Sequence, residues 1–386
     1  MNVFLRRLGK FSSVILLATT PLLGHAQVKI GFAAGLTGDS SHYGVDLERG
    51  AKIAIDEANS SHLKINGKPV TFELVVEDDQ SDPRMGTIVA QRLVDEGVVG
   101  VVGHFNSGTT LPASAIYHSA GIPMVSPTAS NPTLTSQGFN NVFRLVNSDA
   151  QLGAYAARYA VQNMHAMHIG TLDDRTAFGQ GLADAFSKAV VAAGGTVADR
   201  EFTADQSEDF RAQITAMKAK GVDVVFFAGL DKQAGELSKQ IHQLNLKATI
   251  LGGGSFANDN FLSLAGPTGE GTVSWEPGVA LSMMPGGAGF DAKMKSRYHA
   301  GVLAYSPNAY DAVWTLIHAM QKANSTEPKV YLPAVVQTSF AGVSGPISFM
   351  PNGDLKDPPA TLYKVINGKW VPQMIARNGQ MHPLGQ

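Results

Sequence analysis

The sequence contains no cysteine among its 386 residues. This absence excludes disulfides, thiolate metal sites, a cysteine nucleophile and an N-terminal cysteine that carries lipid. The chain also lacks a charge imbalance, with 30 Lys and Arg against 32 Asp and Glu, whereas nucleic-acid binders normally carry a basic excess. What is present is typical of a globular protein: 44% of the residues are hydrophobic and 16% are charged. At roughly 100–200 residues per domain, the length favours two domains.

The first 26 residues have the three parts of a secretory signal. A basic start with Arg6, Arg7 and Lys10 precedes a short apolar stretch, and Gly24-His25-Ala26 supplies the small residues of a cleavage site. The stretch is too short to span a bilayer stably, which favours a cleaved signal over a membrane anchor. No later segment has about 18 uninterrupted apolar residues, so we expect no other membrane segment. Without a lipid-bearing cysteine, we expect the exported protein to be retained by a second membrane, in the periplasm of a Gram-negative bacterium.

Short apolar runs alternate with segments of helical period from residue 28 onward. Helices are expected over Val45–Asn59, over Pro83–Glu96 with Asp82 as its cap, and over Leu111–Ala120; strands are expected over Val28–Ala33, Val70–Val76, Val98–Gly103 and Pro123–Ser126. The run VVGVVG at 98–103 is apolar on both faces, as a central parallel strand must be when helices cover both sides. This order predicts an open, doubly wound α/β sheet.

The same pattern then begins again. Strands are expected over His165–Leu172, Val197–Phe202, Val222–Ala228, Thr249–Gly252 and Thr272–Trp275, and helices over Phe178–Ala193, Phe210–Lys220, Gln233–Leu244, Phe290–Ala300 and Ala309–Lys322. Asn66-Gly67 and Asn367-Gly368 are strong signals for two-residue hairpins. Two α/β runs without a flexible linker predict two touching lobes. Ligands of such sheets bind beyond the carboxyl ends of the strands, so the cleft between the lobes is the expected site.

The most informative loop follows the strand at 98–103. Its residues Phe105, Asn106 and Ser107 are candidate ligand-binding residues, because free N–H groups and the positive end of a helix attract an anion and Ser107 adds a hydroxyl donor. A carboxylate would suit this loop. Plain capping of the helix by Ser107 or Thr109 explains the same pattern equally well.

Three further loops also follow expected strands. Thr128 and Ser130 lie between Pro127 and Pro132, where the Ser130 hydroxyl can donate and the Thr128 carbonyl can accept, although an ordinary proline-bounded loop has the same pattern. Phe178 stands near a helix start and offers an aromatic wall, or else a packing residue. Asp231 offers a carboxylate for an ammonium group, or else a helix cap.

No pattern for metal, cofactor or covalent chemistry is present. The acidic run at 77–82 lacks the spacing and the turn glycine of a calcium loop, and Gly252-Gly253-Gly254 is not followed by the Lys-Ser/Thr of a phosphate loop. No serine stands in a GxSxG elbow, and we expect His104 to be a packed or hydrogen-bonded residue. We therefore expect no cofactor, no metal and no catalytic residue.

At these loops the chain resembles the leucine/isoleucine/valine-binding protein family, the type I periplasmic solute-binding components of ABC importers. The matching text includes KIGFAAGLTGDSSHYG, EDDQSDP, VVGVVGHFNSGTTLPAS, YHSAGIPMVSPTASNPTLT, DDRTAFGQGLADAF and GPISFMPNGDLKDPPATLY. The resemblance implies two Rossmann-like lobes joined by three crossovers. Lobe one would combine 27–147 with 276–357, and lobe two would combine 148–275 with 358–386.

The resemblance also implies roles for particular residues. Ser107 and Ser130 would bind an α-carboxylate, the Thr128 carbonyl would hold an ammonium group, and Tyr43 and Phe178 would line the pocket from opposite lobes. The sequence departs from the family at two places. The segment Leu251–Phe256 reads LGGGSF and lacks the usual acidic partner of the ammonium, and Leu230 replaces an aromatic. Asp231, which lies next to Leu230, could take over the ammonium.

The function that follows is a non-catalytic, monomeric periplasmic receptor. It would capture a small, branched-chain or other aliphatic amino acid by hinge closure and deliver it to an ABC permease with its ATPase. Because the usual acid is absent, a ligand without an α-ammonium group (a carboxylate, an amide or a urea-like compound) is an alternative. A sensory receptor subunit is a second alternative.

Overall fold

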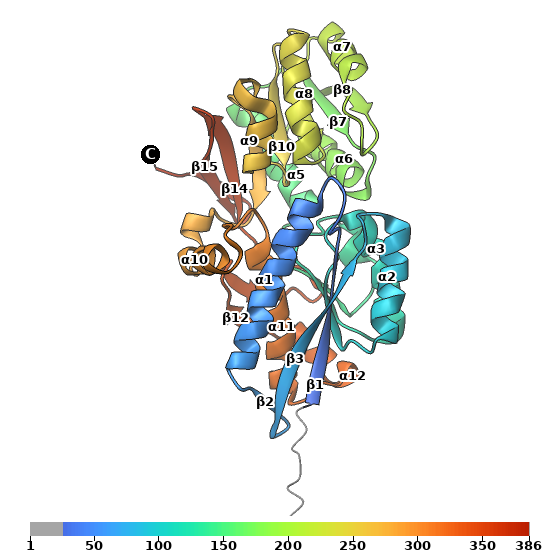
Figure 1. Ribbon diagram of the computed structural model, residues 1–386. Coiled ribbons are helices and arrows are strands. Elements are labelled where there is room, and N and C mark those ends of the chain that lie inside the picture. The colour runs from blue at the N-terminus through green and yellow to red at the C-terminus, as the bar shows by residue number, and fades with distance from the viewer. Residues whose placement is uncertain (1–25, 386) are drawn as a thin grey trace, which may run out of the picture.

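The computed structural model describes residues 26–385 (Figure 1). The predicted signal peptide, residues 1–26, lies outside the described residues except for Ala26, which begins strand β1. Within the described range, no helix combines the length and the apolar character that crossing a bilayer requires.

The first sheet has six strands in the order β2-β3-β1-β4-β5-β6. The strands are β1 (Ala26–Ala34), β2 (Lys64–Ile65), β3 (Lys68–Asp78), β4 (Gly100–Gly103), β5 (Met124–Ser126) and β6 (Val142–Arg144). Neighbours run parallel except β2 and β3, which form the hairpin predicted from Asn66-Gly67. If the short β2 is left out, β3 lies at one edge of the sheet and β1 lies beside it. This is a doubly wound order, and its ligand sites lie where the order reverses.

The second sheet has eight strands in the order β16-β15-β14-β11-β10-β9-β7-β8. The strands are β7 (Ile169–Asp173), β8 (Val197–Phe202), β9 (Val224–Ala228), β10 (Thr249–Gly253), β11 (Val273–Pro277), β14 (Ala360–Ile366), β15 (Lys369–Arg377) and β16 (Gln380–Pro383). Strands β7 to β11 are parallel and repeat the order of the first sheet. The last three strands are antiparallel, and β14 and β15 meet at the predicted Asn367-Gly368 turn. The restart of the pattern predicted from the sequence is thereby confirmed.

Helices cover both faces of each sheet. The helices are α1 (Ser41–Ser60), α2 (Pro83–Asp95), α3 (Ser107–Ala120), α4 (Thr133–Ser136), α5 (Asp149–Arg158), α6 (Ala177–Ala192), α7 (Arg211–Ala219), α8 (Asp231–Gln243), α9 (Asp259–Ala265), α10 (Gly287–Tyr298), α11 (Ser306–Ala323) and α12 (Pro328–Val335). Helices α1 and α11 pack on one face of the first sheet, and α2 and α3 pack on the other. On the second sheet, α5 and α6 lie opposite α7, α8 and α9.

We call lobe one the first sheet with α1–α4, α10–α12 and the small hairpin of β12 (Ser339–Ala341) and β13 (Pro346–Ser348), and lobe two the second sheet with α5–α9. In Figure 1 lobe two stands above lobe one. The chain passes between the lobes three times, from β6 to α5, from β11 to α10 and from β13 to β14. The two-lobed fold with three crossovers is therefore as predicted.

Local signals were reliable where they named a specific hydrogen bond. The predicted cap Asp82 accepts bonds from the backbone N–H of Arg84 (2.7 Å) and Met85 (3.1 Å) at the start of α2. The strand predicted to begin at His165 begins at Ile169, because a π-helical turn at Tyr159–Asn163 prolongs α5 first. The helix predicted from Leu111 begins one turn earlier, at Ser107.

Two glycines in helices predict opposite effects of the same substitution. A Cβ at Gly50 in α1 would overlap the carbonyl oxygen of Ser306, where α11 begins, whereas a Cβ at Gly289 in α10 meets no atom within 4 Å. We expect Gly50→Ala to lower the free energy of unfolding by about 1–3 kcal/mol through overpacking. Gly289→Ala should raise it by about 0.5–1 kcal/mol, because alanine loses less backbone entropy in a helix. Urea denaturation of both variants measures the two signs, and equal effects would contradict the close approach of α1 and α11.

Candidate ligand-binding cleft

A cavity of about 460 Å³ lies between the lobes, at the carboxyl ends of both sheets. Lobe one contributes the loops after β3, β4 and β5, and lobe two contributes those after β7 to β11. The volume is in the range of small-molecule sites, about 300–1,000 Å³. Because the loops of parallel strands meet at one edge of each sheet, the two lobes face each other with their polar loop residues.

The lobe one wall consists of hydroxyl groups and a helix N-terminus. Ser107 is the first residue of α3, and its Oγ accepts a hydrogen bond from the backbone N–H of Asn131 at 3.2 Å. This bond joins the loop after β4 to the loop that contains Ser130, so both serines line the same cavity. The Thr128 hydroxyl donates to the carbonyl of Phe105 at 2.7 Å and fixes the two loops further. The arrangement can accept an anion, since the positive end of α3 also points here.

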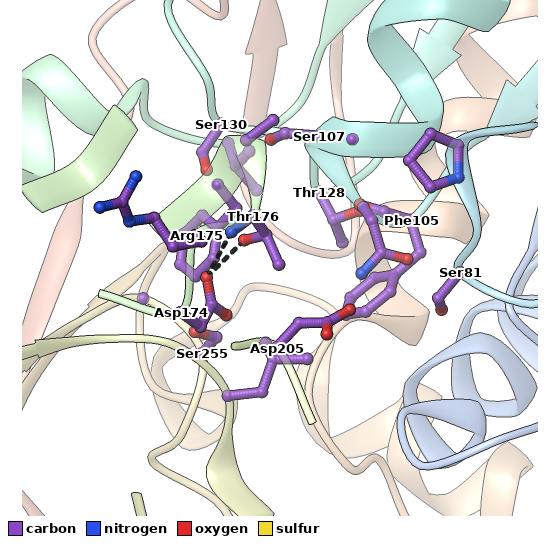
Figure 2. A pocket seen from close by; sticks show the side chains of 18 of the residues that line it. Ser81, Phe105, Ser107, Thr128, Ser130, Asp174, Arg175, Thr176, Asp205 and Ser255 are labelled. Carbon is purple, nitrogen blue, oxygen red and sulfur yellow. Dashed lines mark hydrogen bonds between the residues drawn. The ribbon is translucent and has the colours of Figure 1, made fainter. Parts of the chain in front are cut away.

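The lobe two wall carries two carboxyl groups, Asp174 after β7 and Asp205 after β8. Figure 2 shows them below Ser107 and Ser130, across the pocket. Asp174 Oδ1 accepts bonds from the backbone N–H (2.9 Å) and the hydroxyl (2.7 Å) of Thr176. Burial raises the pKa of Asp174 to about 6, and those two bonds oppose the rise.

Apolar side chains line the remainder of the cavity. They are Phe105, Val146, Leu152, Phe178, Leu230 and Pro277, with the Tyr305 ring close by. Phe178 stands in the first turn of α6, whose cap Thr176 accepts a bond from the backbone N–H of Gly179 at 3.0 Å. The cavity therefore offers an apolar surface between two polar walls.

Tyr43 and Asp231, two of the predicted site residues, lie outside the lining of the cavity. Tyr43 stacks on Phe105, with ring centroids 5.1 Å apart, and its hydroxyl donates to the carbonyl of Ser255 in lobe two. Asp231 Oδ2 accepts bonds from His42 Nε2 (2.8 Å), Asn258 Nδ2 (3.0 Å) and Asn260 Nδ2 (3.1 Å). Burial tends to raise the pKa of Asp231, but these bonds outweigh it and the pKa is lowered.

The bonds of Asp231 and Tyr43 belong to a set that joins the two lobes. His42 and Tyr43 stand at the start of α1 in lobe one, whereas Asp231 starts α8 in lobe two. Asn131 Nδ2 donates to the carbonyl of Ala177 (2.6 Å), and Lys232 Nζ donates to Asp39 Oδ2 (2.8 Å). These contacts hold the lobes together around the cavity.

The family profile described as periplasmic binding protein matches residues 27–369. The chain belongs to this family. The match covers both lobes and therefore the whole cleft.

Relatives of this periplasmic binding protein extend over nearly its full length. The Leu/Ile/Val-binding protein BraC3 of Rhizobium johnstonii is 34% identical over 357 residues, which cover 92% of this chain and 96% of that protein. Leu/Ile/Val-binding protein homolog 1 of Brucella suis is also 34% identical and covers 92% of this chain and 95% of its own.

Solved structures with similar folds include two named for branched-chain amino acids. The leucine-binding protein LivK of Thermotoga maritima superimposes with a TM-score of 0.84 at 26% identity and covers 91% of this chain and 99% of that chain. LivJ of Streptococcus pneumoniae, in complex with isoleucine, has a TM-score of 0.82 at 25% identity with the same coverage.

Six of the eight predicted site residues line the cleft of this periplasmic binding protein: Phe105, Asn106, Ser107, Thr128, Ser130 and Phe178. Sequence reasoning missed Asp174, Asp205, Ser255 and Tyr305. Asp205 could have been predicted, because it follows the strand predicted at Val197–Phe202 and ligands of such sheets bind beyond the carboxyl ends of the strands. Tyr305 precedes α11, and no local signal distinguishes it. His104, as predicted, is fully buried and bonded to Asp79 (2.6 Å) and Tyr117 (3.0 Å).

Asp149 is a buried carboxyl group behind the cavity. It begins α5 directly after the first passage between the lobes, and its backbone N–H donates to the carbonyl of Ser130 at 2.9 Å. Neither carboxyl oxygen accepts a hydrogen bond from the described residues. Burial raises the pKa of Asp149 to about 7, and the nearby Ser130 hydroxyl and the charge of Arg144 oppose this only in part.

The raised pKa predicts a pH-dependent stability. Between its ordinary value and about 7, the native state holds a proton that the unfolded chain releases, so this group makes the free energy of unfolding fall as pH rises. We expect Asp149→Asn to be more stable than the wild type by about 1–3 kcal/mol at about pH 8, and the difference should shrink towards about pH 5. Urea denaturation across this range measures it. Exposed Asp95→Asn is the control, and a difference at Asp149 that does not change with pH would contradict the assignment.

Proposed function

We propose that this protein is the periplasmic substrate-binding component of an ABC importer. It captures a small aliphatic amino acid between its lobes and delivers the closed form to a membrane permease with its ATPase, without catalysis. The observation that carries the proposal is the cleft itself: a hydroxyl-lined helix N-terminus on one lobe, an apolar middle and carboxylates on the other lobe. The names of the relatives, which bind Leu, Ile or Val, support the same ligand class.

The carboxylate of the ligand would bind at the lobe one wall. Ser107 and Ser130 donate their hydroxyls, and the N-terminus of α3 adds backbone N–H groups and positive potential. The carbonyl of Thr128 stands beside them as an acceptor for an ammonium group. The aliphatic side chain would pack between Phe105 and Phe178, which face the cavity from opposite lobes.

Capture would proceed by closure of lobe two over a ligand held on lobe one. The proposed rigid bodies are residues 27–147 with 276–357 and residues 148–275 with 358–386. The bonds of Tyr43 and Asp231 across the lobes would stabilise the closed form, which is how these two residues assist binding without lining the cavity. Export by the predicted signal peptide would place the protein, as a monomer, in the periplasm.

A direct test of the carboxylate site is Ser107→Ala. Loss of a hydrogen bond to a charged group costs about 1.5–3 kcal/mol, so affinity for the bound amino acid should fall roughly tenfold to a hundredfold. Ser119→Ala, an exposed serine of the same helix whose Oγ bonds only the carbonyl of Ala115, serves as the control. A screen of amino acids, amides and simple carboxylates first identifies the amino acid that most raises the melting temperature. Calorimetric titration with that amino acid then measures the affinity. Unchanged affinity in Ser107→Ala would reject the site.

Closure is tested by Asp231→Asn. The variant keeps the shape of the side chain but loses the charge that attracts His42, so the closed form should become less favourable. We expect affinity to fall roughly tenfold, which is about 1.4 kcal/mol, and small-angle scattering to show a larger radius of gyration without ligand. Asp259→Asn, an exposed acid at the start of α9, is the control. A variant that stays as compact as the wild type and binds as tightly would contradict this role for Asp231.

A further inference from the structure

Asp174 and Asp205 give the lobe two wall two negative charges in one cavity. They follow β7 and β8, which are neighbours at the edge of the second sheet, so both carboxyls lie at the same end. Asp174 is 3% exposed, and its Oδ2 accepts no hydrogen bond from the described residues. The Asp205 carboxylate points into the pocket, toward the side where Phe105 lies (Figure 2). The negative charge of Asp205 also adds to the rise in the pKa of Asp174.

No cation within residues 26–385 forms an ion pair with either carboxyl group. The nearest cationic residue along the chain, Arg175, extends away from Asp174 in Figure 2. Its guanidinium stacks over the ring of Phe202, 3.4 Å from the centroid. A buried carboxylate without a positive partner is costly, and a positive group of a ligand would relieve that cost.

The other carboxylates near the cleft are already bonded and do not line it. Asp231 accepts bonds from His42, Asn258 and Asn260. Glu276 accepts bonds from the Ser274 hydroxyl (2.7 Å) and the backbone N–H of Ala257 (3.1 Å). The wall between them, at Gly254 and Ser255, carries no charge.

We infer that Asp205 and Asp174 together form the subsite for the ammonium group of the ligand, in place of Asp231. The inference rests on the proposed function and deepens it. The carboxylate of a zwitterionic amino acid then binds Ser107 and Ser130 on lobe one, and its ammonium group, which also contacts the Thr128 carbonyl, binds Asp205 and Asp174 on lobe two. Only a ligand with both charges joins the two walls, so the cleft selects amino acids over their deaminated analogues.

Calorimetry with L-leucine and 4-methylpentanoate, its deaminated analogue, tests the inference in the full-length mature protein. The wild type should bind leucine at least about tenfold more tightly than the analogue. Asp205→Asn should weaken leucine binding by about tenfold or more and leave binding of the analogue unchanged or tighter. Asp209→Asn, an exposed acid of the same loop that pairs with Arg211 outside the cavity, should alter neither.

The possible outcomes distinguish a failure of the ammonium subsite from a failure of the proposed function. Asp205 is exposed, so Asp205→Asn should keep the melting temperature of the wild type. This variant therefore tests the ammonium subsite even if Asp174→Asn, at a more buried residue, fails to fold. An unchanged leucine-to-analogue ratio in Asp205→Asn overturns the subsite. If Ser107→Ala still weakens both compounds in that case, the proposed carboxylate site stands. A wild type that binds neither these compounds nor any other aliphatic amino acid of the screen overturns the aliphatic amino acid function, and the subsite with it.

Discussion

A charged ligand that is enclosed between two lobes loses its water, and the protein must supply a replacement partner for each charge. The arrangement of this cleft follows from that constraint. One wall offers hydroxyls and the N–H groups at the start of α3, and the facing wall offers carboxyls at the exits of β7 and β8. The apolar middle then needs no polar partner. In the proposed binding mode, strength and selectivity both depend on whether the opposite charges of the ligand reach their partners on the two walls.

The repeated order of the two sheets is what brings these groups together. Each lobe contains five parallel strands in the same order, with the first of them inside and the second at one end of the five. The loops beyond the carboxyl ends are therefore the places where helices begin with unpaired N–H groups. Two such edges set face to face create a polar-lined cavity without a dedicated binding domain. Asn131 links the two helix starts: its backbone N–H donates to Ser107 Oγ and its side-chain amide donates to the carbonyl of Ala177.

Most of the fold was predictable because it depends on local patterns. Runs such as VVGVVG and VDVVFFA are apolar on both faces, and Asn-Gly pairs and Asp82 each specify one turn or one cap. The helices α4, α5, α9 and α12 were missed. Helices α4, α9 and α12 have only four, seven and eight residues, too few for a helical period to stand out. In the site, the sequence located the right loops but not the direction of each side chain. Leu230 faces the cavity, whereas Asp231, the next residue, turns toward His42. Leu230 is the extended N-cap and Asp231 is the first residue of α8, so their side chains leave the backbone in different directions, and no spacing rule says which of them faces the ligand.

The three passages between the lobes have a consequence for how the chain can acquire its structure. Helix α11 packs against α1, β4 and β5 in lobe one, and β14 pairs with β11 in lobe two, so each lobe requires segments that are far apart in the sequence. A nascent chain that ends before residue 306 lacks α11, which packs beside α1 on one face of the first sheet, and one that ends before 360 leaves β11 as an open edge. Neither lobe is complete until synthesis is nearly finished. Contacts between such distant residues form slowly, so we expect both lobes to complete their folding late, when nearly all of the chain has been made.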